Sequence, residues 1–252
     1  MQINRKNLSA NENIFLFSEV EGMCPLCTKT LMYEKNGKKM KIFEGAHIYP
    51  LHPTPTEKKL LMNEERLHED VNNLDNIIAL CRDCHKKFDN PRTADEYRKL
   101  VKMKKLLISR THARAGYSDF QIELEIKHII LALVDETDDT NESPLSMNAL
   151  KLNTKANKTL SKLTKRKIRN EITDYYFFIQ KQFMQLDKQY PKSFDRIATQ
   201  VKSFYLNISK TETSQENIYE QLTEWLSKKT ENSSTVSCAI VISFFIQNCE
   251  VF

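Results

Sequence analysis

Glycine and proline are scarce in this chain of 252 residues, with 4 and 7 of each. Both residue types are common at turns, so a β-rich fold with many tight turns is disfavoured. The longest apolar stretch, residues 236–246, contains two serines and is much shorter than the roughly 20 residues that cross a bilayer. We therefore expect a mainly helical protein that is not inserted in a membrane.

The N-terminus lacks the features of a secretory signal, because its apolar run at residues 14–17 is only four residues long. We expect a cytoplasmic protein, in which the six cysteines bind metal or remain thiols and form no disulfides. Cys238 and Cys249 lie in or beside the apolar stretch and are expected to be core thiols. The other four cysteines form two Cys-x-x-Cys pairs.

The net charge of +5 is distributed unevenly. Residues 135–142 contain five acids and no base, whereas basic residues exceed acidic ones on both sides of this segment. A basic balance suits a polyanionic partner. The acidic segment predicts a linker, with a first domain at residues 1–134, an acidic and then basic linker at 135–160, and a second domain at 161–252.

Apolar residues recur at helical spacing in several segments. They predict helices over residues 93–109 and 119–134 in the first domain. In the second domain they predict a helical bundle built from residues 160–189, 194–208, 215–228 and 236–247. The region from Met23 to Asp89 is loop-rich, with an extended segment at 40–48 and a helix that begins near Cys81. The predicted fold class is α+β and mainly helical.

Two cysteine pairs, Cys24/Cys27 and Cys81/Cys84, are separated by 53 residues. Four thiolates in two turn-compatible pairs are typical ligands of tetrahedral zinc. Because all four ligands would be protein thiolates, no coordination position would remain open, and the zinc is expected to be structural.

Three motifs lie between and beside these pairs: Glu44-Gly-Ala-His47-Ile-Tyr-Pro50, Leu74-Asp-Asn76-Ile-Ile-Ala-Leu80, and Cys84-His85-Lys-Lys-Phe88-Asp89. Together they resemble the HNH endonuclease family over residues 23–91. The resemblance implies a zinc-stapled ββα-metal fold that hydrolyses phosphodiester bonds in DNA.

The same resemblance implies the roles of three residues. His47 would be the general base, because an imidazole has a pKa near neutrality. His85 would bind the catalytic metal, and Asn76 would either bind it or orient the loop around His47. The metal would be a single Mg or Mn ion that acts as a Lewis acid on the scissile phosphate.

The sequence departs from the family pattern at Ala46, where many members have an acid or a second histidine before the base. Glu44, two residues earlier on the predicted strand, points to the same side and is the candidate replacement. Asp75 and Asp89 are the reserves. If none of these acids reaches the site, the metal would bind weakly or the nuclease would be inactive.

Four cations beside the predicted helix are candidates for phosphate contacts: Arg82, Lys86, Lys87 and Arg92. Residues 148–170 contain no acid, and their lysines recur at spacings of three and four. This second basic face is either an ordinary solvated surface or a further DNA-binding surface.

The C-terminal segment contains no catalytic motif, which suggests a docking or oligomerisation module. It resembles the C-terminal domain of effectors in bacterial ABC three-component defence systems, relatives of the Lamassu type. This resemblance implies an SMC-like ABC ATPase and a small middle-component protein as partners, which would restrain the nuclease until foreign DNA is sensed. Whether the chain forms a homo-oligomer is left open.

Three functional hypotheses follow. The first is a metal-dependent HNH DNA endonuclease that partners regulate in antiphage defence. The second is a catalytically impaired, zinc-containing DNA-binding or assembly subunit. The third is a stand-alone restriction endonuclease for modified DNA.

Overall fold

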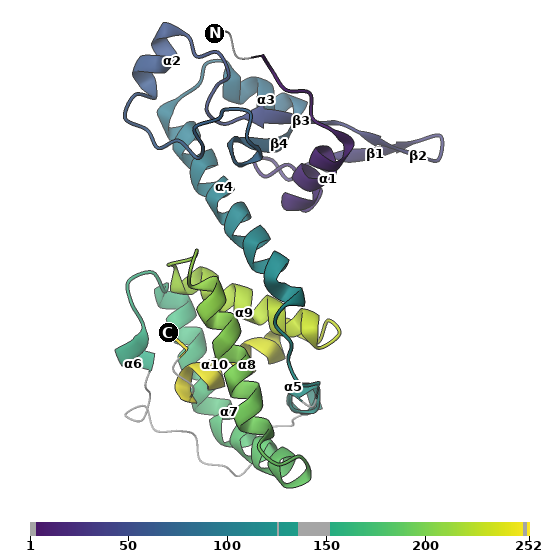
Figure 1. Ribbon diagram of the computed structural model, residues 1–252, viewed down its shortest axis with the longest axis vertical. Coiled ribbons are helices and arrows are strands. Elements are labelled where there is room, and N and C mark those ends of the chain that lie inside the picture. Colours follow the sequence, from purple (N-terminus) through teal and green to yellow (C-terminus); the bar gives the residue numbers. More distant parts are fainter. Residues whose placement is uncertain (1–3, 125, 136–151, 249–250) are drawn as a thin grey trace. The chain divides into compact units, whose positions relative to one another are not determined.

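The computed structural model describes residues 4–124, 126–135, 152–248 and 251–252. The chain divides into two compact units, Met1–Thr111 and His112–Phe252 (Figure 1). Each unit has its own hydrophobic core. The acidic segment expected to act as a linker lies largely outside the described residues.

The first unit contains two small antiparallel sheets and the helices packed on them. One sheet pairs β1 with β2, and the other pairs β3 with β4. The elements in chain order are α1 (Ala10–Glu19), β1 (Met32–Lys35), β2 (Lys38–Lys41), β3 (Phe43–His47), α2 (Pro55–Leu60), the 3-10 helix η1 (Leu74–Asn76), β4 (Ile77–Cys81), α3 (Arg82–Asp89) and α4 (Ala94–Ala115).

Strands β3 and β4 with helix α3 form the centre of this unit. The register pairs Phe43 with Cys81 and His47 with Ile77, so the two strands run side by side over their full lengths. All five residues of β4 are buried, because the apolar run fills the space between the sheet partner and the surrounding helices. Helix α3 follows β4 without a loop, since the Cys81 thiol caps it by accepting from the Cys84 backbone N–H.

Gly45 allows the N-terminal segment to cross β3 closely. A Cβ at this position would lie 2.6 Å from Leu8 Cδ1 and 3.1 Å from Ile77 Cγ2. The Arg5 guanidinium donates to the Gly45 carbonyl at 3.1 Å in the same place. The absence of a side chain therefore brings residues near Arg5 beside the strand that ends at His47.

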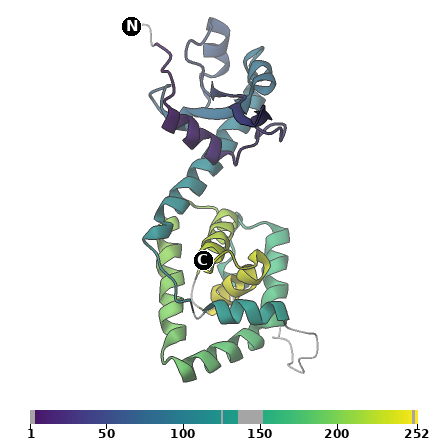
Figure 2. The same ribbon diagram turned by 90° about the vertical axis from the view of Figure 1, so that its right-hand side faces the viewer.

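The second unit is a helical bundle. It contains η2 (Gly116–Ser118), α5 (Ile126–Asp135), α6 (Leu152–Lys155), α7 (Lys162–Gln189), α8 (Ser193–Ile208), α9 (Gln215–Lys229) and α10 (Thr235–Asn248). Every residue of α10 from Ser237 to Gln247 is buried, and Figure 2 shows this yellow helix enclosed by the other helices of its unit. Trp225 stacks on Phe204 with ring centroids 4.5 Å apart, which joins α9 to α8.

The predicted fold class is confirmed: the protein is α+β and mainly helical, and its C-terminal part is a helical bundle. In the described residues, no helix combines the length and the apolar character needed to cross a membrane. The four long helices predicted for the C-terminal part correspond to α7, α8, α9 and α10.

Two features differ from the expectations. The unit boundary falls after Thr111, and α5 belongs to the second unit because Ile126, Ile129 and Ile130 are part of that unit's core. The helix expected over residues 119–134 begins only at Ile126. Before it, the Glu123 backbone N–H donates to the Gln200 side chain, so tertiary contacts hold this segment outside a helix.

Candidate active site

The four paired cysteines come together in the first unit. Their Sγ atoms all lie within 4.8 Å of one another, and the Sγ atoms of Cys27 and Cys81 are 3.6 Å apart. Tetrahedral zinc with bonds of about 2.3 Å would separate its sulfur ligands by roughly 3.8 Å. A hydrogen bond from the Lys29 backbone is the largest cause that lowers the pKa of Cys27 to about 7. Burial is the largest cause that raises the pKa values of Cys81 and Cys84. Four soft sulfur donors at this spacing fit a closed structural zinc site.

His47 ends β3 and is nearly buried. Its Nε2 atom lies 3.3 Å from Oδ1 of Asn72. The backbone fixes the orientation of this amide, because the Lys6 N–H donates to Oδ1 at 3.3 Å and Nδ2 donates to the Asn4 carbonyl at 3.1 Å. Oδ1 therefore acts as an acceptor toward Nε2, which must carry the proton in the neutral ring. The lone pair then resides on Nδ1.

The surroundings of His47 keep its imidazole neutral. Burial is the largest effect and lowers its pKa below the ordinary value, while the hydrogen bond with Asn72 raises the pKa. The positive charges of Arg5 and His85 lower the pKa of His47 further, and the negative charge of Asp89 raises it. A neutral imidazole is the form that accepts a proton.

Asn76 is buried and holds the chain that follows His47. Its Oδ1 atom accepts from the Tyr49 N–H at 2.8 Å, and its Nδ2 atom donates to the carbonyls of Tyr49 and Val71 at 3.0 and 2.9 Å. The Asn76 carbonyl also accepts from the Ile48 N–H at 2.8 Å. All of these partners are backbone groups, at residues 48, 49 and 71.

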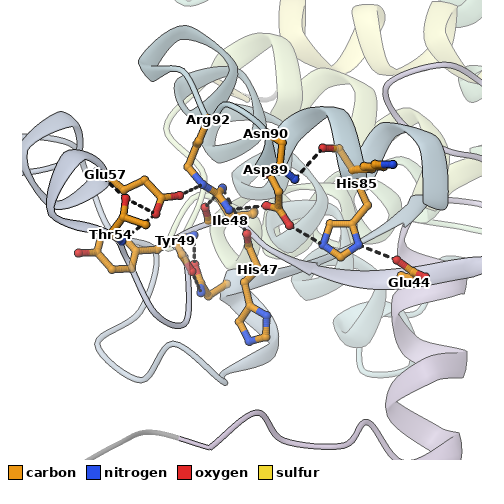
Figure 3. A network of polar contacts seen from close by, with 12 residues as sticks. Glu44, His47, Ile48, Tyr49, Thr54, Glu57, His85, Asp89, Asn90 and Arg92 are labelled. Atoms are coloured by element: carbon orange, nitrogen blue, oxygen red, sulfur yellow. Dashed lines mark hydrogen bonds and ion pairs between the residues drawn. The ribbon is translucent and has the colours of Figure 1, made fainter.

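His85, on α3, lies between two carboxylates (Figure 3). Its Nδ1 atom is 2.8 Å from Oε2 of Glu44, and its Nε2 atom is 3.1 Å from Oδ2 of Asp89. The hydrogen bond with Asp89 is the largest cause that raises the pKa of His85, and the bond with His85 is the largest that lowers the pKa of Glu44. The two carboxylates therefore bond different nitrogens of the ring, and either one together with the nitrogen beside it is a donor pair of the kind that binds Mg or Mn.

Asp75, the other reserve acid, has different neighbours. It lies near the buried ion pair of Glu19 and Lys104, where burial is the largest cause that raises the pKa of Glu19 and lowers that of Lys104, and the charge of Asp75 makes a smaller, upward contribution to both pKa values. It is absent from the described residues that line the cavities around His47. Glu44 and Asp89 are therefore the acids that the fold brings to His85.

Arg92, expected to contact phosphate, is buried and bonded inside the protein. Its guanidinium donates to the Ile48 carbonyl at 2.7 Å, to Asp89 at 2.5 Å and to Glu57 at 3.3 Å (Figure 3). It also stacks over the Phe88 ring at 4.1 Å. These bonds join α3 to the chain after His47, so Arg92 supports the site from within. The other predicted cations, Arg82, Lys86 and Lys87, are exposed.

Two adjoining cavities meet at His47 and Arg5. The first, of about 350 Å³, brings together His47, His85 and Asp89. The second, of about 510 Å³, includes Glu44 and follows β3 as far as Lys41. His47 and His85, which are 38 positions apart in the sequence, thus face one cavity.

Sequence reasoning missed Asn72 and Arg5. Asn72 stands shortly before the Leu74-Asp-Asn76 motif, and its neighbour Asn73 is also an asparagine, so composition alone does not single it out. Arg5 precedes the first helix and lies outside every motif. Both come near His47 only in the folded chain, where the Asn72 amide contacts the imidazole ring and Arg5 lines the same two cavities.

Comparison with known families assigns both units. Residues 24–94 match the HNH endonuclease family, and residues 113–252 match C-terminal domain 11 of the ABC-three component (ABC-3C) systems. No curated protein matches the chain. Both resemblances inferred from the sequence are confirmed. The second match covers more than half of the chain, which therefore belongs to the family of C-terminal domain 11 of the ABC-3C systems and carries an HNH endonuclease domain in front of it.

Proposed function

We propose that the protein is a metal-dependent DNA endonuclease that hydrolyses phosphodiester bonds. The observation that carries the proposal is the meeting of His47, His85 and Asp89 in one cavity. A proton acceptor and a set of metal ligands that face a common space are the parts that this hydrolysis requires.

In the proposed reaction, the Nδ1 atom of His47 accepts a proton from water as the water oxygen attacks phosphorus. The bond from phosphorus to the 3′ oxygen breaks, and the electron pair leaves with that oxygen. Asn72 contributes by holding the Nε2–H tautomer, which leaves Nδ1 available. Asn76 and Arg92 fix the chain after His47 and thereby its orientation.

We propose that His85 binds the divalent ion, with Asp89 or Glu44 as the acidic ligand that Ala46 does not supply. When bound, Mg or Mn would polarise the scissile phosphate and stabilise charge on the departing oxygen. The four cysteines would hold a structural zinc, which a reducing cytoplasm would favour by keeping them as thiols.

We further propose that the protein is the nuclease effector of an antiphage complex. The match of residues 113–252 to an ABC-3C domain supports association with the other components of such a system. An SMC-like ABC ATPase and a small middle-component protein are the expected partners, and the helical unit is the expected docking or oligomerisation module. Partner control would keep the nuclease inactive until foreign DNA is sensed.

An impaired nuclease that serves as a DNA-binding or assembly subunit is the second candidate. Two observations favour it: Ala46 provides no ligand, and both ring nitrogens of His85 are engaged by Glu44 and Asp89. Metal binding would have to replace at least one of these contacts.

A cleavage assay with full-length protein tests the proposal. Supercoiled plasmid is incubated with the protein and Mg, Mn or EDTA, with and without the products of neighbouring genes. Cutting that requires the divalent ion and is lost in His85→Ala is the expected result. DNA that remains intact with every metal and every partner, while binding persists, would instead favour the assembly subunit.

A further inference from the structure

The cavity beside β3 has a basic lining that the reaction itself does not require. Three of the described residues that line it, Arg5, Lys6 and Lys41, are cationic, and Glu44 is the only carboxylate among them. The cavity contains both His47 and Lys41, so it extends from the candidate base to the opposite end of the strand. Lys41 is also the last residue of β2 and pairs with Met32, so the cavity reaches the base of the β1–β2 hairpin.

The hairpin carries more positive charge outward. Figure 1 shows this ribbon projecting from the side of the first unit. Lys35, Lys38 and Lys39 are exposed around its tip, and Glu34 is the only acid in the two strands. The turn is tight, because Asn36 and Gly37 both adopt left-handed backbone conformations with φ of 52° and 70°.

Core packing does not explain this hairpin. Its strands pair with each other and, in the described part of the chain, with no third strand. The facing pair Tyr33 and Met40 is 42% and 43% exposed. An isolated two-stranded hairpin is marginally stable in water, so a ribbon with an exposed apolar pair and a lysine-rich tip suits contact with a partner.

The ion pairs of these lysines leave them available for phosphate. Lys39 lies 2.6 Å from Glu34, and Lys6 lies 2.6 Å from Glu12, but all these lysines are exposed. Exposed ion pairs contribute little free energy, so the side chains can turn toward a polyanion. Lys41 is held in place by Asn13 and by the Phe43 ring, 4.3 Å from its Nζ atom.

We propose that DNA lies along a basic track that runs from His47 over β3 and onto the hairpin. The track consists of Arg5, Lys6, Lys41, Lys35, Lys38 and Lys39. This inference rests on the proposed nuclease function and identifies the surface that holds its substrate. Extended chain rises about 3.3 Å per residue, so the ten steps from Gly37 to His47 span up to roughly 33 Å. The hairpin lysines therefore contact phosphates up to about one helical turn from the cut.

The test measures DNA binding by the full-length chain as a function of salt. Fluorescence anisotropy with a duplex longer than one helical turn compares the parent protein with the hairpin variant K35Q/K38Q/K39Q. The matched control is K99Q/K102Q/K105Q, which removes the same charge from exposed positions on α4, outside the lining of both cavities.

The hairpin variant should bind about tenfold more weakly at low salt, and the slope of log affinity against log salt should fall by roughly 2 to 3. The α4 variant should retain the affinity and slope of the parent. Equal effects of the two variants, or no effect of either, would overturn the track. If neither variant changed DNA binding, the hairpin would instead be a surface for a protein partner.

A photocrosslinker at Tyr33 provides a second measurement. Benzoylphenylalanine placed there should cross-link to DNA within about one helical turn of the cleaved phosphate. If the hairpin variant bound DNA more weakly and Tyr33 cross-linked to DNA, but no DNA was cleaved, the proposed nuclease function would be refuted and the DNA-binding track retained. Cleavage that proceeds normally in the hairpin variant, with no cross-link at Tyr33, would refute the track and retain the nuclease.

Discussion

At the scale of single residues, the site depends on an amide that selects a tautomer. Two backbone bonds orient the Asn72 side chain, and the oriented oxygen directs the proton of His47 to Nε2. Asn72→Ala should therefore lower kcat by about tenfold to a hundredfold with little change in KM. Asn72→Asp should preserve the tautomer, because a carboxylate also accepts from Nε2–H.

Nitrogen-15 spectra of the histidine rings provide a readout besides activity. The parent and Asn72→Asp should show a protonated Nε2 in neutral His47, whereas Asn72→Ala should show a mixture of tautomers. A protonated Nδ1 in the parent would refute the proposed role of Asn72.

The lowered pKa of His47 determines how the cleavage rate should depend on pH. The base is active only when neutral, so the rate should fall as pH decreases through the pKa of His47 in the folded protein. Burial lowers that pKa most, Arg5 and His85 add to the shift, and the hydrogen bond with Asn72 and the charge of Asp89 oppose it. Because the net shift is downward, activity should persist below the ordinary value of about 6.5. Single-turnover rates measured across this range would contradict the account if the acid limb lay above that value.

The sequence predicted that His47 and His85 share a site and that the four cysteines form a cluster, because the motifs keep their order and spacing along the chain. Asn72 and Arg5 could not be predicted, since each lies near His47 through contacts between segments that are far apart in the sequence. Arg92 was expected to reach phosphate because it is a cation beside α3. Its burial depends on carbonyls and acids that other segments supply.

At the scale of elements, a buried ion pair joins α1 to α4. Lys104 Nζ lies 2.5 Å from Oε2 of Glu19, and both side chains are almost wholly buried. Burial lowers the pKa of Lys104 and raises that of Glu19, so each charge depends on the other. Lys104→Met should destabilise the first unit by about 3 to 5 kcal/mol in urea unfolding, because it leaves a buried carboxyl without its partner.

The double variant Glu19→Leu/Lys104→Met controls for the loss of charge alone. It should be clearly more stable than Lys104→Met, since no unpaired buried charge remains. A double variant that is less stable than the single one would show that packing, and not the ion pair, accounts for the effect.

Helical spacing identified the long helices because their apolar stripes face a continuous core. It failed at residues 119–124, where Arg196 pairs with Glu123 and the Gln200 side chain accepts from the Glu123 backbone N–H. These contacts come from α8, far along the chain, so no local pattern records them. The β1–β2 hairpin was also hard to predict, because neither face of its strands is buried and its sequence therefore lacks a regular alternation of apolar and polar residues.

In the whole molecule, each of the two units has its own hydrophobic core, so we expect them to respond differently to the removal of zinc. The cysteine cluster lies entirely in the first unit, where it joins the turn before β1 to the start of α3. A strong chelator should therefore unfold the first unit and leave the second folded, since a structural zinc typically contributes about 10 kcal/mol or more. Circular dichroism should show partial loss of helix, and metal analysis should find one zinc per chain.

A chelated protein that loses the second unit as well would contradict the independence of the two cores. Cys81→Ser should reproduce the effect of the chelator, whereas Cys238→Ser should not weaken zinc binding. Cys238 is buried in the core of the second unit and takes no part in the cluster.

The most direct test of the account is whether His47 is needed for cutting but not for binding. Plasmid cleavage and DNA affinity are measured for the parent, His47→Ala and His128→Ala with Mg or Mn and any partners required. His128 is an exposed histidine on α5 and serves as the matched control. His47→Ala should abolish cleavage while DNA binding remains, and His128→Ala should still cut. Cleavage that survives in His47→Ala would contradict it.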